Sequence, residues 1–265
     1  MCGIYFKGKK VKVWGNRLDL SSRGIKSIFE IKGLKNLIDL KELSLSGNEI
    51  KEIEGIEQLT NLEWLNLRYN QITEIKNLEN LTGLKYLFLY NNNISEIKGL
   101  NNLINLKELN LYDNSITEIK GLKNLVQINE LYLGSNRISE IKGLGTLINL
   151  KFLNLEKNKI SEIKGLNTLK DLILLVLKWN TISEIKGLQN LRKLMRLEIS
   201  NNLITEIKGL EMLNALFKLD LKGNPIYESD IPIDQINSSR KLVKLLDAQE
   251  LVEYCKNKNR KKSIT

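Results

Sequence analysis

The chain of 265 residues contains no histidine, two cysteines and two prolines. Without histidine, it lacks the side chain that most often serves as a general base or a metal ligand. Cys2 and Cys255 stand near opposite ends, so they cannot form a cysteine cluster for zinc. Neither a GxxxxGK(S/T) nor a GxGxxG phosphate-binding motif is present. We therefore expect no enzymatic activity, no metal and no cofactor.

Long apolar runs are also missing. No run of about 18 or more apolar residues occurs, so we expect no membrane span. Residues 1–15 contain lysines but no apolar segment before a small-residue cleavage site, so we expect no secretory signal. The low cysteine count suits a reducing compartment. These features together predict a cytoplasmic protein.

The net charge of +10 is concentrated at the two ends. Four lysines and no acid lie in residues 1–16, and five cationic residues and no acid lie in residues 256–262, which leaves about +1 for everything between. A basic surface is typical of nucleic-acid or membrane contact. This distribution makes a specific role with nucleic acid the weaker interpretation.

One 22-residue pattern organises the rest of the chain. The frame Leu-x-x-Leu-x-Leu-x-x-Asn-x-Ile-x-x-Ile is repeated nine times in constant register across residues 40–227. Its asparagines are Asn48, Asn70, Asn92, Asn114, Asn136, Asn158, Asn180, Asn202 and Asn224. A fixed period with this composition is typical of leucine-rich repeat solenoids.

The repeat predicts an α/β solenoid, a horseshoe with a concave parallel sheet of about ten strands. A unit of this length leaves little room for an α-helix, so we expect a 3₁₀ helix or a single turn on the convex return leg. Apolar positions such as Leu84, Leu87 and Ile94 should fill the core. Each asparagine amide should satisfy buried backbone groups of its own and neighbouring turns.

The ends deviate from the frame and should cap the stack. Residues 1–16 predict an N-terminal strand or hairpin, in which Val11, Val13 and Trp14 could cover the open end. Residues 17–39 form a degenerate first repeat, and residues 228–257 predict a helical cap, with the helix at residues 241–255 and Ser238 or Ser239 as its N-cap. Residues 258–265 form a basic tail.

Positions that vary between units on one face are candidates for function. Side chains alternate along a strand, so residues equivalent to Glu42, Ser44 and Ser46 should line the concave face. Seven of these 27 positions are aromatic, where the chain average of 6% predicts fewer than two. The predicted partner-binding residues are Trp64, Arg68, Tyr69, Tyr86, Phe88, Tyr90, Glu108, Tyr112, Glu130, Tyr132, Phe152, Glu156, Lys178 and Trp179. Strand propensity alone also favours aromatics, but the last strands carry none.

Two further columns are nearly invariant between units. Glutamates equivalent to Glu96 and lysines equivalent to Lys98 recur throughout the array. We interpret them as a solvated flank whose charges neutralise each other, since exposed pairs add little stability.

The unit Ile-x-x-Ile-x-Gly-Leu, as in residues 94–100, resembles the subfamily typified by the leucine-rich-repeat regulatory subunit of protein phosphatase 1. Bacterial internalins have a similar unit, usually with proline where Gly99 stands. The resemblance spans residues 17–227. It implies a partner held by aromatic and acidic concave residues, of the kind of Trp64, Phe88, Glu108 and Tyr132.

Three functions follow from the sequence. The first is a non-catalytic scaffold, monomeric, that binds a protein or peptide partner on its concave aromatic face. The second is a regulatory subunit of an enzyme, a phosphatase or a small GTPase, that uses the same face. The third is an adaptor that contacts nucleic acid or an anionic membrane through its basic termini.

Overall fold

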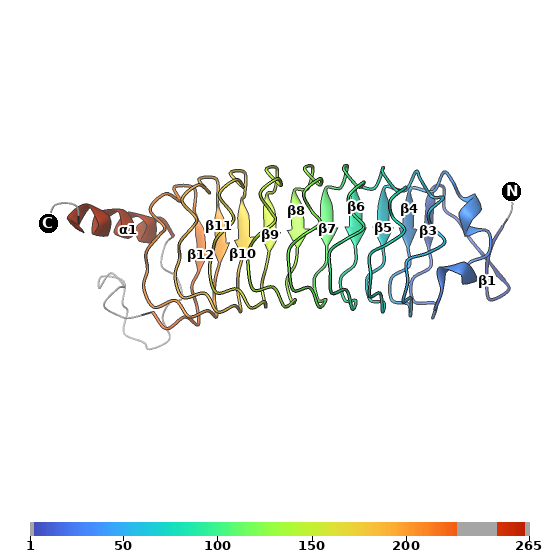
Figure 1. The fold of residues 1–265 in the computed structure, drawn as a ribbon, viewed down its shortest axis with the longest axis horizontal. Coiled ribbons are helices and arrows are strands. Elements are labelled where there is room, and N and C mark those ends of the chain that lie inside the picture. The colour runs from blue at the N-terminus through green and yellow to red at the C-terminus, as the bar shows by residue number, and fades with distance from the viewer. Residues whose placement is uncertain (1–2, 227–247, 263–265) are drawn as a thin grey trace.

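The computed structural model describes residues 3–226 and 248–262. These residues form one elongated stack of turns, in which each turn lies beside the next along the long axis (Figure 1). Every repeat contributes one short strand and one return leg, so each unit contacts mainly its two neighbours.

One parallel sheet of ten strands runs the length of the stack. Neighbouring strands pair with equivalent positions one repeat apart, as Leu87 with Leu109. This architecture confirms the predicted solenoid with a sheet of about ten strands. The strands are β3 (Arg17–Asp19), β4 (Glu42–Ser44), β5 (Trp64–Asn66), β6 (Tyr86–Phe88), β7 (Glu108–Asn110), β8 (Glu130–Tyr132), β9 (Phe152–Asn154), β10 (Leu174–Val176), β11 (Arg196–Glu198) and β12 (Lys218–Asp220).

The core is a continuous column of leucine and isoleucine between the sheet and the return legs. In the repeat that starts at Leu84, the frame positions Leu84, Leu87, Leu89 and Ile94 are all completely buried. Burial of one such side chain contributes about 1.5–3 kcal/mol before the entropy cost of ordering is counted. Stacking therefore stabilises units that could not fold alone.

The return legs are simpler than the sequence suggested. Only the degenerate first repeat contains 3₁₀ helices among the described residues, η1 (Ile28–Glu30) and η2 (Leu34–Asn36). The regular repeats return through successive turns, in which the Leu103 N–H donates to the Leu100 carbonyl and the Leu106 N–H to the Leu103 carbonyl, both at 3.0 Å. The predicted convex side of 3₁₀ helices or turns is therefore made almost entirely of turns.

Both ends of the stack are covered. At the N-terminal end, β1 (Ile4–Phe6) and β2 (Lys9–Val11) form an antiparallel hairpin that buries Ile4, Phe6 and Val11. Val13 is partly buried against the core, but Trp14, expected to contribute, is 65% exposed. Its backbone is used instead, because the Trp14 and Arg17 backbones hydrogen-bond to each other and continue the chain into β3.

At the C-terminal end, α1 (Ala248–Lys262) buries Leu251, Val252 and Cys255 against the last turns. Our prediction ended this helix at Cys255, whereas it continues to Lys262. The extra turns are tied to the stack, since Lys258 forms an ion pair of 3.0 Å with Glu206. The expected helix start, with Ser238 or Ser239 as N-cap, lies outside the described residues. Burial raises the pKa of the free Cys255 thiol to about 11.

The asparagine of the frame joins consecutive turns through four hydrogen bonds. Asn136 Nδ2 donates to the carbonyls of Leu111, Leu133 and Gly134 at 3.0–3.1 Å. Its Oδ1 accepts from the Ile116 N–H of the preceding repeat at 2.9 Å. The same pattern recurs at Asn70, for example to Leu45 and Leu67. This column of amides satisfies backbone groups that the turn would otherwise leave buried and unpaired.

Each return leg also needs one residue with left-handed backbone geometry. Gly165 has φ +79°, and a Cβ at this position would collide with the Ile141 carbonyl of the preceding repeat. Asn77 occupies the equivalent position at φ +58°, and its side chain donates to the Ile53 carbonyl at 2.7 Å. Glycine and asparagine are the residues that tolerate this conformation best.

Within the described ranges, α1 included, no helical segment combines the length and the apolar character needed to cross a bilayer.

We expect Asn136→Ala to lower the free energy of unfolding by about 1–3 kcal/mol, because it leaves buried backbone groups without partners. Denaturant unfolding measures this loss. Asn124→Ala is the matched control, since that exposed amide makes one hydrogen bond to the Asn101 carbonyl. A loss no larger than that of the control would contradict the proposed role of the asparagine column.

We expect Gly165→Ala to destabilise the chain by at least about 1 kcal/mol, because the methyl group is strained by the positive φ and meets backbone. At Gly145 an added Cβ has open space around it, so Gly145→Ala should be neutral or slightly stabilising. Thermal unfolding of both variants tests this. Equal effects at the two sites would show that the close approach between turns is not constraining.

Candidate functional site

The outward side of the parallel sheet is a long surface whose residues change from repeat to repeat. The first and third residues of each strand flank a completely buried leucine, such as Leu87 between Tyr86 and Phe88. Together with the residue two positions further on, they form what we call the sheet face. Since the frame does not fix these side chains, their chemistry is free to serve a purpose other than folding.

Aromatic rings gather on the sheet face over β5 to β9. Trp64 and Phe88 lie with ring centroids 5.5 Å apart, and Tyr132 and Phe152 with centroids 4.7 Å apart. None of the rings is buried in the core. We call this group the aromatic cluster; its members are Trp64, Tyr86, Phe88, Tyr90, Tyr112, Tyr132 and Phe152.

Arg68 and Tyr69 extend the aromatic cluster at the end of the strands. One guanidinium N–H of Arg68 donates to the Tyr90 hydroxyl at 2.8 Å, and Tyr69 meets the Tyr90 ring edge-on at 5.1 Å between centroids. The arrangement holds Tyr90 from two sides and fixes the orientation of its ring.

Tyr69 and Trp179 occupy a backbone position that is unfavourable for large side chains. Both have positive φ, +52° and +56°, and their side chains are 51% and 55% exposed. Other repeats place Gly47, Asn91 or Asp113 at the same position, which are the residues that tolerate it. Ser135 and Lys157 also have positive φ at this position, so the repeat imposes this conformation on residues of several kinds.

Two contributors to the sheet face were missed by counting aromatics. Gly134 has no side chain, and the Tyr112 ring occupies the space where its Cβ would project. Leu174 pairs in register with Phe152 and continues the apolar surface onto β10, where Val176 is buried. The sequence signal for Gly134 was a glycine at a strand position where neighbouring repeats carry large side chains. Leu174 would be found only if aliphatic and aromatic positions were counted together.

Charged residues take over beyond the aromatic cluster. Lys178 lies between Glu198 and Glu156, at 2.8 Å and 3.6 Å, and Arg196 also pairs with Glu198. Burial opposes ionisation of Glu198, but Lys178 and Arg196 outweigh it and hold its pKa below the ordinary value. The hydrogen bond with Glu198 raises the pKa of Lys178. This network is internally neutralised.

Glu108 and Glu130 lie side by side inside the aromatic cluster, as register partners on β7 and β8. Desolvation by neighbouring groups, and then the charge of Glu130, raise the pKa of Glu108 above its ordinary value. The Tyr132 hydroxyl donates to Glu130 at 2.8 Å. Burial and this hydrogen bond raise the pKa of Tyr132.

Not every polar residue on the sheet face is available for binding. Asn66, Asn110 and Asn154 each accept a hydrogen bond from the backbone N–H two residues further along, at 2.9–3.2 Å. They stabilise the chain where it leaves the strand. The sequence prediction did not include them among the binding residues.

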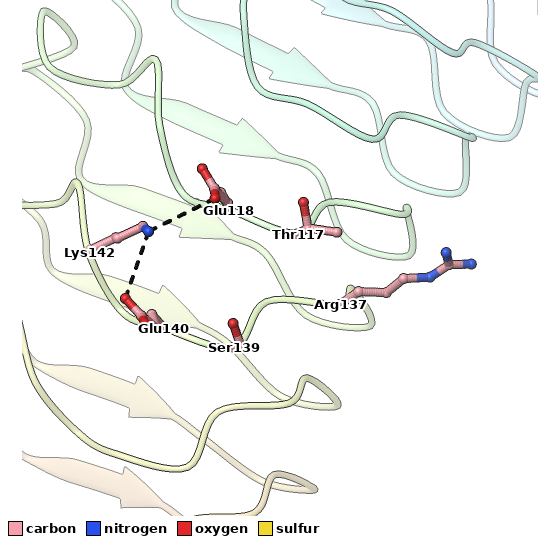
Figure 2. A pocket seen from close by; sticks show the side chains of 6 residues that line it. All are labelled: Thr117, Glu118, Arg137, Ser139, Glu140 and Lys142. Atoms are coloured by element: carbon pink, nitrogen blue, oxygen red, sulfur yellow. Dashed lines mark ion pairs between the residues drawn. The ribbon is translucent and has the colours of Figure 1, made fainter.

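The charge columns form ion pairs along one flank. Figure 2 shows Lys142 between Glu118 and Glu140, with nitrogen–oxygen distances of 4.0 Å and 3.7 Å, at a shallow surface depression. An equivalent depression lies one repeat earlier, around Glu96 and Lys120. A feature that recurs with the repeat and neutralises its own charges has the character of a solvated flank. Among the described residues, no group of acidic side chains and cysteines could hold a metal ion.

The structure therefore places all fourteen predicted site residues on or at the rim of the sheet face, in two groups. The aromatic cluster, Arg68, Tyr69, Glu108 and Glu130 lie over the middle strands. Glu156 and Lys178 belong to the neutralised network, and Trp179 is at the rim beside Lys178.

Comparisons with known proteins agree with this architecture. The family described as "Leucine rich repeat" matches residues 16–72, and "Leucine Rich repeats (2 copies)" matches residues 60–102 and 104–146. No curated protein sequence matches the chain.

Three solved structures illustrate the similarity. The internalin inlF from Listeria monocytogenes is 29% identical with a TM-score of 0.64, over 80% of this chain and 68% of that protein. Internalin C2 from the same species is 28% identical with a TM-score of 0.56, over 78% and 82%. The TLR13–ssRNA13 complex is 28% identical with a TM-score of 0.66, over 72% of this chain and 30% of that one.

None of these three is a phosphatase subunit, so the resemblance to that subunit stays a prediction. The repeats, the stacked parallel strands and these similarities all indicate the leucine-rich repeat fold. This fold generally serves as a scaffold for protein–protein interaction. The chain is built of leucine-rich repeats, which the family descriptions match within residues 16–146.

Proposed function

We propose that this chain is a non-catalytic scaffold that binds a protein partner on the aromatic cluster of its sheet face. The observation that carries the proposal is the aromatic cluster itself: seven rings that the repeat frame does not require, gathered on adjacent strands and accessible to solvent. Exposed apolar patches with polar surroundings are typical of interaction sites. Aromatic anchors also carry much of the binding energy in protein interfaces.

Rigidity supports the same proposal. The rings stand on strands that are hydrogen-bonded to both neighbours, and pairs such as Trp64 with Phe88 hold each other in place. Arg68 restrains Tyr90 in the same way. A surface that is already ordered loses little conformational entropy on binding, which favours affinity.

The flank is a poorer candidate for the binding surface. Its glutamates and lysines form ion pairs with each other, as Lys98 does with Glu74 at 2.8 Å. A partner would have to break these pairs without gaining burial of large apolar groups. The cytoplasmic location and the monomeric state stay predictions from the sequence.

We expect the variant Tyr86→Ala/Phe88→Ala/Tyr112→Ala to lose its partner, with affinity reduced roughly 100-fold or more because several anchors are removed at once. Affinity capture from native lysate compares it with the wild type. The control is Ile104→Ala/Val126→Ala/Ile148→Ala, which removes exposed apolar groups from the return legs. Thermal unfolding checks that both variants fold.

The proposal requires the wild type and the control to recover the same protein and the aromatic variant to lose it. If all three recover the same proteins, the sheet face is not the binding site. Salt distinguishes an adaptor acting through the basic termini, since electrostatic binding to phosphates falls by several orders of magnitude between about 50 and 200 mM salt. An interface anchored by aromatics should persist.

A further inference from the structure

The middle of the aromatic cluster contains a carboxylate without a cation. Glu108 forms no ion pair or side-chain hydrogen bond within residues 3–226 and 248–262. Its register partner Glu130 carries the same charge and accepts only the Tyr132 hydroxyl. Two like charges on adjacent strands repel each other, and partial burial strengthens that repulsion.

Three acidic residues further along the same face, Glu42, Glu156 and Glu198, are paired with cations within the chain. Glu42 lies 3.5 Å from Arg17 at one end. At the other end Lys178 contacts both Glu156 and Glu198. The contrast shows that a basic side chain can lie beside an acidic one on the sheet face and pair with it. Within the part of the chain that the structure describes, no such basic partner lies beside Glu108 and Glu130.

Aromatic residues lie on the strands to either side of the pair. Tyr86 is the register partner of Glu108 on β6, and Phe152 is the register partner of Glu130 on β9. Tyr132 packs against Phe152 next to them. A group that binds at the pair therefore meets two carboxylates, with an aromatic residue beside each of them.

A guanidinium group fits this environment better than other side chains do. It donates several N–H groups in a planar fork that can contact two carboxylates, and its flat faces stack on aromatic rings. A lysine ammonium is a compact, strongly hydrated charge that gains less from the same aromatic residues. A neutral partner would leave the two partly buried carboxylates without a cation.

We propose that Glu108 and Glu130 together bind the guanidinium of an arginine side chain on the partner protein, with the aromatic residues Tyr86 and Phe152 on the strands to either side of the two carboxylates. This inference rests on the proposed function, since it specifies the chemistry of the partner that occupies the aromatic cluster. The charge that is missing from this part of the sheet face is supplied by the partner, and binding discriminates against surfaces that lack a cation.

In the free chain, Glu108→Gln should raise the melting temperature at neutral pH by a few degrees, because it removes a desolvated charge next to Glu130. The raised pKa of Glu108 means that the folded state holds this proton more tightly than the unfolded state. Stability from this group is thus present at low pH and lost as pH rises from the ordinary glutamate value through the raised one. The facing titratable groups are Tyr86 on β6 and Glu130 and Tyr132 on β8.

The stability difference between Glu108→Gln and wild type should therefore be small near pH 3 and grow toward neutral pH. Thermal unfolding across this range measures it. Glu118→Gln, on the flank, is the control; its carboxylate has Lys142 as a partner, so no gain is expected there. A loss of stability in Glu108→Gln at neutral pH would show that the free chain already satisfies this carboxylate.

A random peptide display library tests the arginine directly, with the full chain as bait. Three baits are compared: wild type, Glu108→Gln/Glu130→Gln, and Glu118→Gln/Glu140→Gln. The last pair has the same spacing and the same change in charge but lies on the flank. Wild type and the flank control should enrich arginine-containing peptides that bind the sheet face. The Glu108→Gln/Glu130→Gln bait should not.

In one selected peptide, exchange of the arginine for its neutral isostere citrulline should weaken binding to wild type about 10–100-fold. The same exchange should change binding to Glu108→Gln/Glu130→Gln only a few-fold. Lysine at this position should also weaken binding to wild type. Full retention of affinity with lysine would overturn the assignment of a guanidinium.

The outcomes separate this inference from the proposed function. Peptides that lose binding to Tyr86→Ala/Phe88→Ala/Tyr112→Ala but show no arginine enrichment would overturn the arginine site and leave the binding face intact. Peptides indifferent to that variant, or no enrichment with any bait, would count against both.

Discussion

The stack depends on one side chain per turn, the asparagine that joins each coil to its neighbours. Its amide donates to carbonyls of its own turn and of the preceding one, as Asn136 does to Leu133 and Leu111, and its oxygen accepts from a backbone N–H of the preceding repeat. These bonds set the distance and the register between coils at the same time. The leucine core supplies the driving force for stacking, but leucine alone would tolerate slippage. The asparagine column does not, because each shift would leave buried amides unpaired.

Much of the fold could be predicted from the sequence, because a repeat averages out local ambiguity. Nine copies of one frame specify the parallel sheet and the buried leucines, and the departures from the frame at either end predict the covered ends. Local details that depend on a single context were less accessible. Trp14 was expected to cover the first coil and lies outside it, since Ile4, Phe6 and Val11 already fill that space. The end of α1 was set too early, because the contact of Lys258 with Glu206 bridges residues far apart in the sequence.

Part of the candidate site could be predicted from the sequence for the same reason. Once the frame is known, the non-repeating strand positions can be read directly, so the aromatic cluster was found as a set. Contacts between side chains of adjacent repeats could be identified only from the structure. The sequence placed Glu156, Lys178, Glu108 and Glu130 in one class of charged neighbours. The structure divides them, since Lys178 neutralises Glu156, whereas no cation among the described residues pairs with the other two. Gly134 was missed because its contribution is the space that it leaves for Tyr112.

The constant step between coils places equivalent residues of the sheet at regular intervals along the axis. Adjacent strands are about 4.8 Å apart, so the five steps from β6 to β11 separate Tyr86 from Arg196 by about 24 Å along the axis. Gain or loss of one complete unit during evolution would preserve every asparagine bridge and shift the groups on either side by a single increment. The length of the array and the spacing of its recognition groups therefore change together, in steps of one repeat. Each such step would suit a differently spaced partner while the stacking of the coils is preserved.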